Sequence, residues 1–209
     1  MIQVIIADDH ELIRSGLARL IERETDIILA AEASDAAGAI ELLSARPCDV
    51  LILDISLPDR NGIEVLKEVI RRYPHLAVLI LSIHPEDQYA LRALNAGAAG
   101  YITKDNASTE FIRAIRKVAG GGRYVGEQTA ERMAATLTDH KPVAPHELLS
   151  DREHQILALL GEGKSARTIA DELHLSFHTV HTYRRRIMEK LELESTSQLV
   201  RYALEKEIT

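Results

Sequence analysis

The chain has no tryptophan, a single cysteine and few aromatic residues, which make up 4% of its 209 residues. Because Cys48 has no second cysteine to pair with, no internal disulfide can form, and we expect a reducing compartment such as the cytoplasm. The first residues lack the basic flank and cleavage site of a signal peptide. No stretch approaches the ~20 apolar residues that span a bilayer. We therefore expect no membrane partner.

The chain also lacks a positive net charge, since its formal charge is -7 at pH 7. This balance argues against a protein that binds nucleic acid indiscriminately. The charge is unevenly divided: 16 basic and 21 acidic residues lie up to His146, and 9 basic and 11 acidic residues follow it. The second part is therefore close to neutral. The length suits two small domains better than one large domain.

Strand-like and helix-like segments alternate along the first 120 residues. Apolar, β-branched runs predict strands at 2–7, 27–33, 50–53, 77–81 and 100–103. Helical patterns follow each run, at 12–21, 36–45, 62–72, 86–95 and 108–119. Such a series predicts an α/β fold, a doubly wound five-stranded parallel sheet covered by helices on both faces.

The character of the chain changes after Gly120-Gly121-Gly122, which ends the last of these helices. One more helix is predicted at 127–137, and the segment 138–146, with two prolines, reads as extended. Four short helices are predicted beyond it, at 151–161, 166–174, 177–191 and 197–206. We therefore expect a first domain at 1–120, a linker at 121–145 and an all-α domain at 146–209.

Polar side chains follow four of the predicted strands. They are Asp8 and Asp9, Asp54, Ser82 and Lys104. Ligands of parallel sheets bind beyond the carboxyl ends of the strands, so we expect these residues to form one site. A carboxylate can attack phosphorus, Mg²⁺ prefers oxygen ligands, and an ammonium or hydroxyl can bind a phosphate oxygen. The alternative is that either aspartate of the first pair caps the following helix and that the others are surface residues.

A basic cluster marks the third helix of the second part. It consists of Arg184, Arg185, Arg186 and Lys190, with Lys164 and Arg167 upstream. Ser176 is a natural N-cap, and an apolar stripe of Val180, Ile187 and Leu191 is expected to face the core. That register turns His178, His181, Thr182 and Arg185 toward solvent. The preceding helix and the tight turn between them predict a helix-turn-helix. A solvated basic face is the plainer alternative.

Three motifs resemble the receiver domains of two-component response regulators. They are Ala7-Asp8-Asp9-His10, the run 53–58 with Asn61-Gly62, and Tyr101-Ile102-Thr103-Lys104-Asp105. The resemblance implies a flavodoxin-like receiver in which Asp54 accepts a phosphoryl group from a sensor histidine kinase. It also implies an Mg²⁺ (or Mn²⁺) site made by Asp8, Asp9, Asp54 and the Ser56 carbonyl. The phosphate-sensing switch would comprise Ser82, Tyr101 and Lys104.

The region from about residue 146 to the end resembles LuxR-type DNA-binding domains, and the whole chain resembles NarL/FixJ-type regulators. The motifs are Leu149-Ser150-Asp151-Arg152-Glu153, the run 163–170 and the Thr179-Val180 step. The implied contacts with double-stranded promoter DNA are Lys164, Ser176, His178, Thr179, His181, Thr182, Arg184, Arg185 and Lys190. A homodimer is expected when the protein is phosphorylated, and RNA polymerase is a further candidate partner.

This interpretation describes a phosphorylation-controlled transcriptional regulator rather than an enzyme. One alternative is a Mg²⁺-dependent phosphatase, because such enzymes also place acids at strand ends. A second is a constitutive regulator whose first domain serves only for dimerisation. A third is a quorum-sensing regulator with a signal pocket, which the opening motifs and low aromatic content disfavour.

Overall fold

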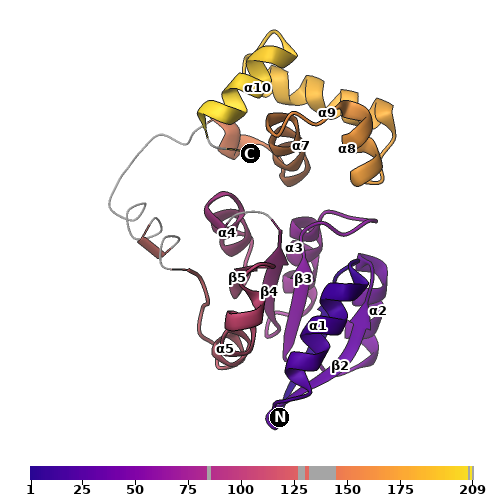
Figure 1. Ribbon diagram of the computed structural model, residues 1–209, viewed down its shortest axis with the longest axis vertical. Coiled ribbons are helices and arrows are strands. Elements are labelled where there is room, and N and C mark those ends of the chain that lie inside the picture. The colour runs from indigo at the N-terminus through magenta and orange to yellow at the C-terminus, as the bar shows by residue number, and fades with distance from the viewer. Residues whose placement is uncertain (84–85, 127–129, 132–144, 207, 209) are drawn as a thin grey trace. The chain divides into compact units, whose positions relative to one another are not determined.

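The computed structural model of the chain describes residues 1–83, 86–126, 130–131, 145–206 and 208 (Figure 1). It contains two compact units, Met1–Thr138 and Asp139–Thr209. The helix predicted at 127–137 and the extended segment predicted at 138–146 lie almost entirely outside the described residues. Within the part that is described, no helix combines the length and the apolar character that crossing a bilayer requires.

The first unit is built on a five-stranded, fully parallel sheet with the order β2-β1-β3-β4-β5. The strands are β1 (Ile2–Ala7), β2 (Ile27–Ala33), β3 (Val50–Asp54), β4 (Ala77–Ser82) and β5 (Gly100–Thr103). This confirms the predicted sheet. All five residues of β3 are buried, which explains why its sequence shows a continuous apolar run instead of alternation.

Helices cover both faces of this sheet (Figure 1). They are α1 (Glu11–Ile21), α2 (Ala36–Ala45), α3 (Gly62–Arg72), α4 (Glu86–Asn95) and α5 (Ala107–Ala119). One buried cluster joins the sheet to α1 and α5, and a second joins it to α2, α3 and α4. The arrangement confirms the doubly wound fold and leaves the carboxyl ends of the strands at one edge.

The second unit is helical within its described residues. It contains a short 3₁₀ helix (Pro145–Leu148), α7 (Asp151–Gly161), α8 (Ala166–Glu172), α9 (Phe177–Lys190) and α10 (Thr196–Glu205). Ser150 and Glu153 form a reciprocal capping box at the start of α7. The prediction that α8 extends to His174 was wrong by two residues. His174 has a φ of 50°, which is left-handed backbone that a helix cannot continue.

Gly62, the first residue of α3, brings that helix against the end of β3. Its N–H donates to the carbonyl oxygen of Ile55 at 2.8 Å. A Cβ at this position would lie 2.2 Å from the Asp54 carbonyl oxygen and 2.6 Å from the Ile55 Cα. Both neighbours are backbone atoms and cannot yield cheaply. Only glycine therefore allows α3 to approach this closely to the backbone of Asp54, the residue that carries the carboxylate of the site.

We predict opposite effects for two glycine-to-alanine changes. Gly62→Ala should lower the free energy of unfolding by about 1–3 kcal/mol, the usual cost of overpacking. Gly16→Ala, in an exposed part of α1 with open space around the new Cβ, should raise it by about 0.5–1 kcal/mol. Urea unfolding of the two variants measures both values. Equal effects of the two changes would contradict the close approach at Gly62.

Candidate functional site

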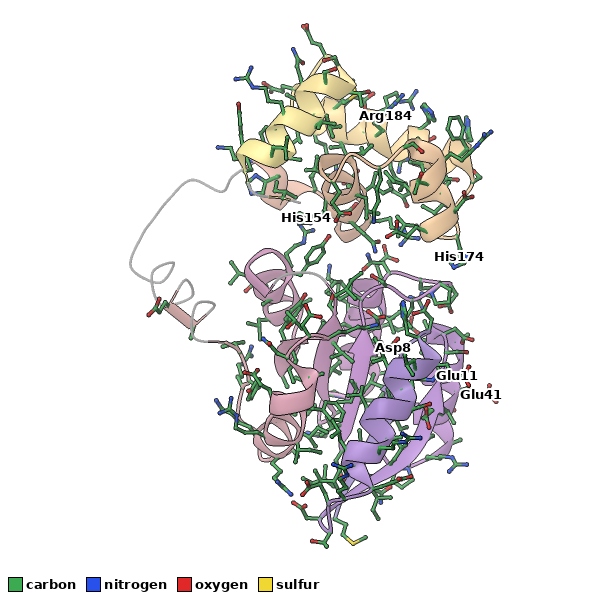
Figure 2. The ribbon with its side chains drawn as sticks, viewed as in Figure 1. Asp8, Glu11, Glu41, His154, His174 and Arg184 are labelled. Atoms are coloured by element: carbon green, nitrogen blue, oxygen red, sulfur yellow. The ribbon has the colours of Figure 1, made fainter. Side chains whose placement is uncertain are left out.

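Three charged side chains from different strand ends meet at the carboxyl edge of the sheet. Asp8 directly follows β1, where Figure 2 labels it, Asp54 is the last residue of β3, and Lys104 directly follows β5. The two aspartates are fully buried, and the Lys104 side chain is only 5% exposed. Because the strands are parallel, residues far apart in the sequence are brought to one place.

The Lys104 ammonium joins the two carboxylates. Its Nζ lies 2.7 Å from Asp8 Oδ2 and 2.8 Å from Asp54 Oδ2. Burial raises the pKa of Asp54, and the charge of Lys104 opposes this rise without cancelling it. Burial also acts to lower the pKa of Lys104, but the negative charges of Asp54 and Asp8 outweigh it, so the pKa is raised. Lys104 therefore keeps its positive charge at neutral pH.

The same edge has the ligand set of a divalent cation site. Oxygens of Asp8, Asp9 and Asp54 and a ring nitrogen of His10 all lie within 4.8 Å of one another. Two buried carboxylates share the single positive charge of Lys104, so the buried cluster retains negative charge that a cation can neutralise. Carboxylate oxygens suit Mg²⁺, and these residues fit it.

His10 is part of the motif singled out in the sequence, but no role was predicted for it. Its Nδ1 lies 2.6 Å from Asp9 Oδ1 and 3.2 Å from Asp8 Oδ1, and the ring is about half exposed. Its main-chain N–H also donates to Asp8 Oδ1 at 2.8 Å. His10 thus fixes the orientation of both aspartates from the solvent side.

Ser56 and Ser82 hold the backbone around the acids. The N–H of Ser56 donates to Asp54 Oδ1 at 2.9 Å, which places Ser56 beside the carboxylate. Ser82 ends β4 with its side chain buried, and its carbonyl oxygen accepts from the Lys104 N–H at 2.7 Å. Tyr101 in β5 is 1% exposed, within the buried cluster that includes Tyr89. Its ring is therefore already inside the protein.

In the second unit, α8 and α9 form the predicted helix-turn-helix. The Leu175 N–H donates to the Ala170 carbonyl oxygen at 2.8 Å, which closes the turn. Ser176 caps α9, because its Oγ accepts from the Thr179 N–H at 3.0 Å and contacts Thr179 Oγ1 at 2.7 Å. The stripe predicted for the core is buried; its members are Val180, Ile187 and Leu191.

The residues predicted to contact DNA differ in how far they reach solvent. His178 and Arg185 are exposed, whereas His181, Thr182 and Arg184 are half-buried on α9. A hollow of about 350 Å³ lies along this helix. It is lined by His178, His181, Thr182, Arg184, Arg185 and Met188. Figure 2 labels Arg184 on this helix.

Lys164 and Lys190 are engaged by carboxylates of their own unit. Lys164 Nζ lies 3.0 Å from Glu162 and 2.9 Å from Glu172. Lys190 Nζ lies 2.6 Å from Glu153 Oε2. Burial acts to raise the pKa of Glu153, but its bonds with Lys190 and with the N-terminal backbone of α7 outweigh this and lower the pKa. Each ammonium therefore has carboxylate partners within its own unit, and these partners reduce the positive charge that it offers to an outside anion.

Each of the two units matches a known protein family. Residues 4–116 match the family model of the response regulator receiver domain, and residues 147–203 match the model of bacterial regulatory proteins of the LuxR family. The chain is 34% identical over 205 residues to the response regulator UvrY of Escherichia coli K12, covering 98% of this chain and 94% of UvrY. It is 33% identical over 205 residues to the response regulator GacA of Pseudomonas aeruginosa, covering 98% and 96%.

Among solved structures, the chain resembles RcsB from Salmonella enterica serovar Typhimurium bound to promoter rprA in the presence of the phosphomimetic BeF3-. The TM-score is 0.66 with 26% identity, over 97% of this chain and 98% of that one. The chain belongs to the NarL/FixJ-type two-component response regulators, which join a receiver domain to a LuxR-type DNA-binding domain. This family regulates transcription, and its receivers generally bind Mg²⁺ at the acidic pocket.

We predict that Lys104→Met will increase the stabilisation that Mg²⁺ gives to the receiver. Removal of the ammonium leaves two buried carboxylates without their shared cation, so the variant should be less stable in EDTA than the original protein. Mg²⁺ should then bind it more tightly and raise its Tm by a larger amount. Thermal unfolding with EDTA and with saturating Mg²⁺ measures this difference. The same Tm shift in both proteins would show that the cation does not share this cluster.

We predict a pH-dependent role for Glu153 in the second unit. Glu153→Gln removes the charge that holds Lys190, and it should lower the local stability of α7 by about 1 kcal/mol at pH 7. Because the pKa of Glu153 is lowered in the folded protein, this contribution is complete above the ordinary carboxyl range and is lost as the pH falls below it. Hydrogen exchange of the α7 amides at pH 7 and at acidic pH measures it. A difference between the two proteins that persists at acidic pH would contradict the role of the charge.

Proposed function

We propose that Asp54 accepts a phosphoryl group from a sensor histidine kinase and that this modification controls dimerisation and promoter binding. The observation that carries the proposal is a buried carboxylate at the end of β3 whose Oδ2 lies 2.8 Å from the Lys104 ammonium. In the transfer, an Asp54 oxygen forms a bond to phosphorus while the bond from phosphorus to the kinase histidine nitrogen breaks. The imidazole leaves with the electron pair of that bond.

The acids around Asp54 fit the cation that such a transfer needs. Asp8, Asp9, Asp54 and the Ser56 carbonyl would hold Mg²⁺ or Mn²⁺, which would neutralise charge on the phosphoryl oxygens when bound. Lys104 lies where it can exchange a carboxylate partner for a phosphoryl oxygen.

The switch would rest on contacts that exist in one state only. Ser82 and Lys104 would gain a phosphoryl oxygen as a partner after phosphorylation, and the output can shift by no more than this difference in interaction. Because the Tyr101 ring is already buried, we propose that it keeps this inward position when Asp54 is phosphorylated. The buried ring also favours a second candidate, a constitutive regulator whose receiver serves only for dimerisation.

The second unit would bind promoter DNA as a pair of copies. A domain with 9 basic and 11 acidic residues after His146 has little non-specific attraction for DNA, so two half-sites about one helical turn apart are needed. We propose base contacts by His181, Thr182 and Arg185, and phosphate contacts by Lys164, Arg184 and Lys190. Ser176, His178 and Thr179 would lie against the DNA at the start of α9. The proposed domains are 1–120 and 146–209.

Further partners follow from this assignment. Promoter DNA of a bacterium lies in the cytoplasm, so the proposed function places the protein there. RNA polymerase would be contacted from the promoter-bound dimer.

We predict that Asp54→Ala abolishes phosphorylation by acetyl phosphate in Mg²⁺, measured as the mass of one added phosphoryl group. Asp59→Asn is the matched control. Asp59 lies in the loop after β3, but its carboxylate accepts from the Ala36 and Ala37 N–H groups at 2.9 and 3.0 Å and so caps α2. The Asn variant retains a capping oxygen and should be labelled normally. Stoichiometric labelling of Asp54→Ala would show that the acceptor is a different residue.

A further inference from the structure

The His181 ring is held on both sides by side chains of its own helix. Phe177, four residues earlier, packs against it edge-to-face with ring centroids 4.4 Å apart and an interplanar angle of 62°. Arg184, three residues later, places Nη2 at 2.8 Å from His181 Nδ1. Residues at these spacings follow one stripe of a helix. The ring is therefore oriented before any ligand arrives.

The contact with Arg184 determines which ring nitrogen carries the proton. A guanidinium donates hydrogen bonds and cannot accept them, so Nδ1 of His181 must be the acceptor. A neutral imidazole that accepts at Nδ1 carries its hydrogen on Nε2. The free edge of the ring thus presents an N–H donor.

We propose that His181 selects a purine at one position of each half-site by donating its Nε2–H to purine N7, with Phe177 and Arg184 as positioning residues. The inference rests on the proposed DNA-binding function. Both purines present N7 as an acceptor in the major groove, whereas cytosine presents an amino donor and thymine a carbonyl oxygen beside a methyl group. A donor held in one orientation can therefore bond N7 of either purine, whereas cytosine offers it no acceptor and the methyl group of thymine lies beside the only acceptor of that base.

The place of His181 on α9 supports this role. It lies in the first half of the second helix of a helix-turn-helix, which is the part that meets base edges. It also lines the hollow along α9 together with His178 and Thr182. Phe177 is 53% exposed, so packing against His181 accounts for only part of its surface.

In the first experiment, the full chain is treated with beryllofluoride and Mg²⁺ and is used to select the DNA duplexes that it binds from a pool of random sequences. The original protein should enrich a site with one purine position that His181→Phe loses, because phenylalanine keeps a flat ring but has no N–H. Arg184→Ala should weaken the same preference, and because Arg184 is also a proposed phosphate contact, it should lower the affinity for all sequences as well. Arg186→Ala, which removes an equal charge from an exposed residue near Tyr183, is the matched control and should keep it. Circular dichroism of each variant verifies that the helices are intact.

The second experiment tests whether purine N7 is the atom that accepts the hydrogen bond from His181. A 7-deazapurine at the selected position removes N7 and leaves base pairing intact, and it should weaken binding by the original protein by about three- to tenfold. It should have no effect on His181→Phe. If the original protein tolerates 7-deazapurine, or if His181→Phe keeps the purine preference, the inference is overturned. If the original protein enriches no sequence at all, the proposed function itself fails.

Discussion

The buried ammonium of Lys104, held between Asp8 and Asp54, is the interaction on which the receiver depends. Charges that are removed from water are tolerated when they are paired, and removing one partner leaves an uncompensated charge. One ammonium cannot balance two carboxylates. The receiver can therefore fold with these charges buried, and the cluster still retains negative charge that a cation can neutralise. An added phosphoryl group changes this balance at the residue where the proposed chemistry occurs.

The same lysine connects the charge cluster to the backbone. Its N–H donates to the Ser82 carbonyl oxygen, and it lies three residues after Tyr101 on the continuation of β5. A new partner for Lys104 would therefore act on the segment that also carries Tyr101 and, through the backbone bond, on Ser82. In the second unit, carboxylates restrain Lys164 and Lys190, so the proposed DNA binding would depend more on specific contacts from α9 than on overall charge. The proposed bond from His181 to a purine would be one such contact.

Much of this structure could be predicted because local signals and burial agree. The strands are continuous apolar runs in a sheet covered on both faces, and Ser150 and Ser176 begin their helices as natural caps. The predicted end of α8 was wrong because a left-handed residue, His174, leaves no composition signal. The pair of Lys190 with Glu153 was missed because it joins residues 37 positions apart through the tertiary fold. The contact of His181 with Arg184 has helical spacing and was visible in principle.

The central claim is that the state of Asp54 controls DNA binding. The most direct test is the affinity of the full chain for a selected promoter duplex, with and without beryllofluoride in Mg²⁺, for the original protein and for Asp54→Ala. We expect beryllofluoride to raise the affinity of the original protein and to leave that of Asp54→Ala unchanged. Equal affinity of the original protein in the two conditions would contradict the account and favour a constitutive regulator.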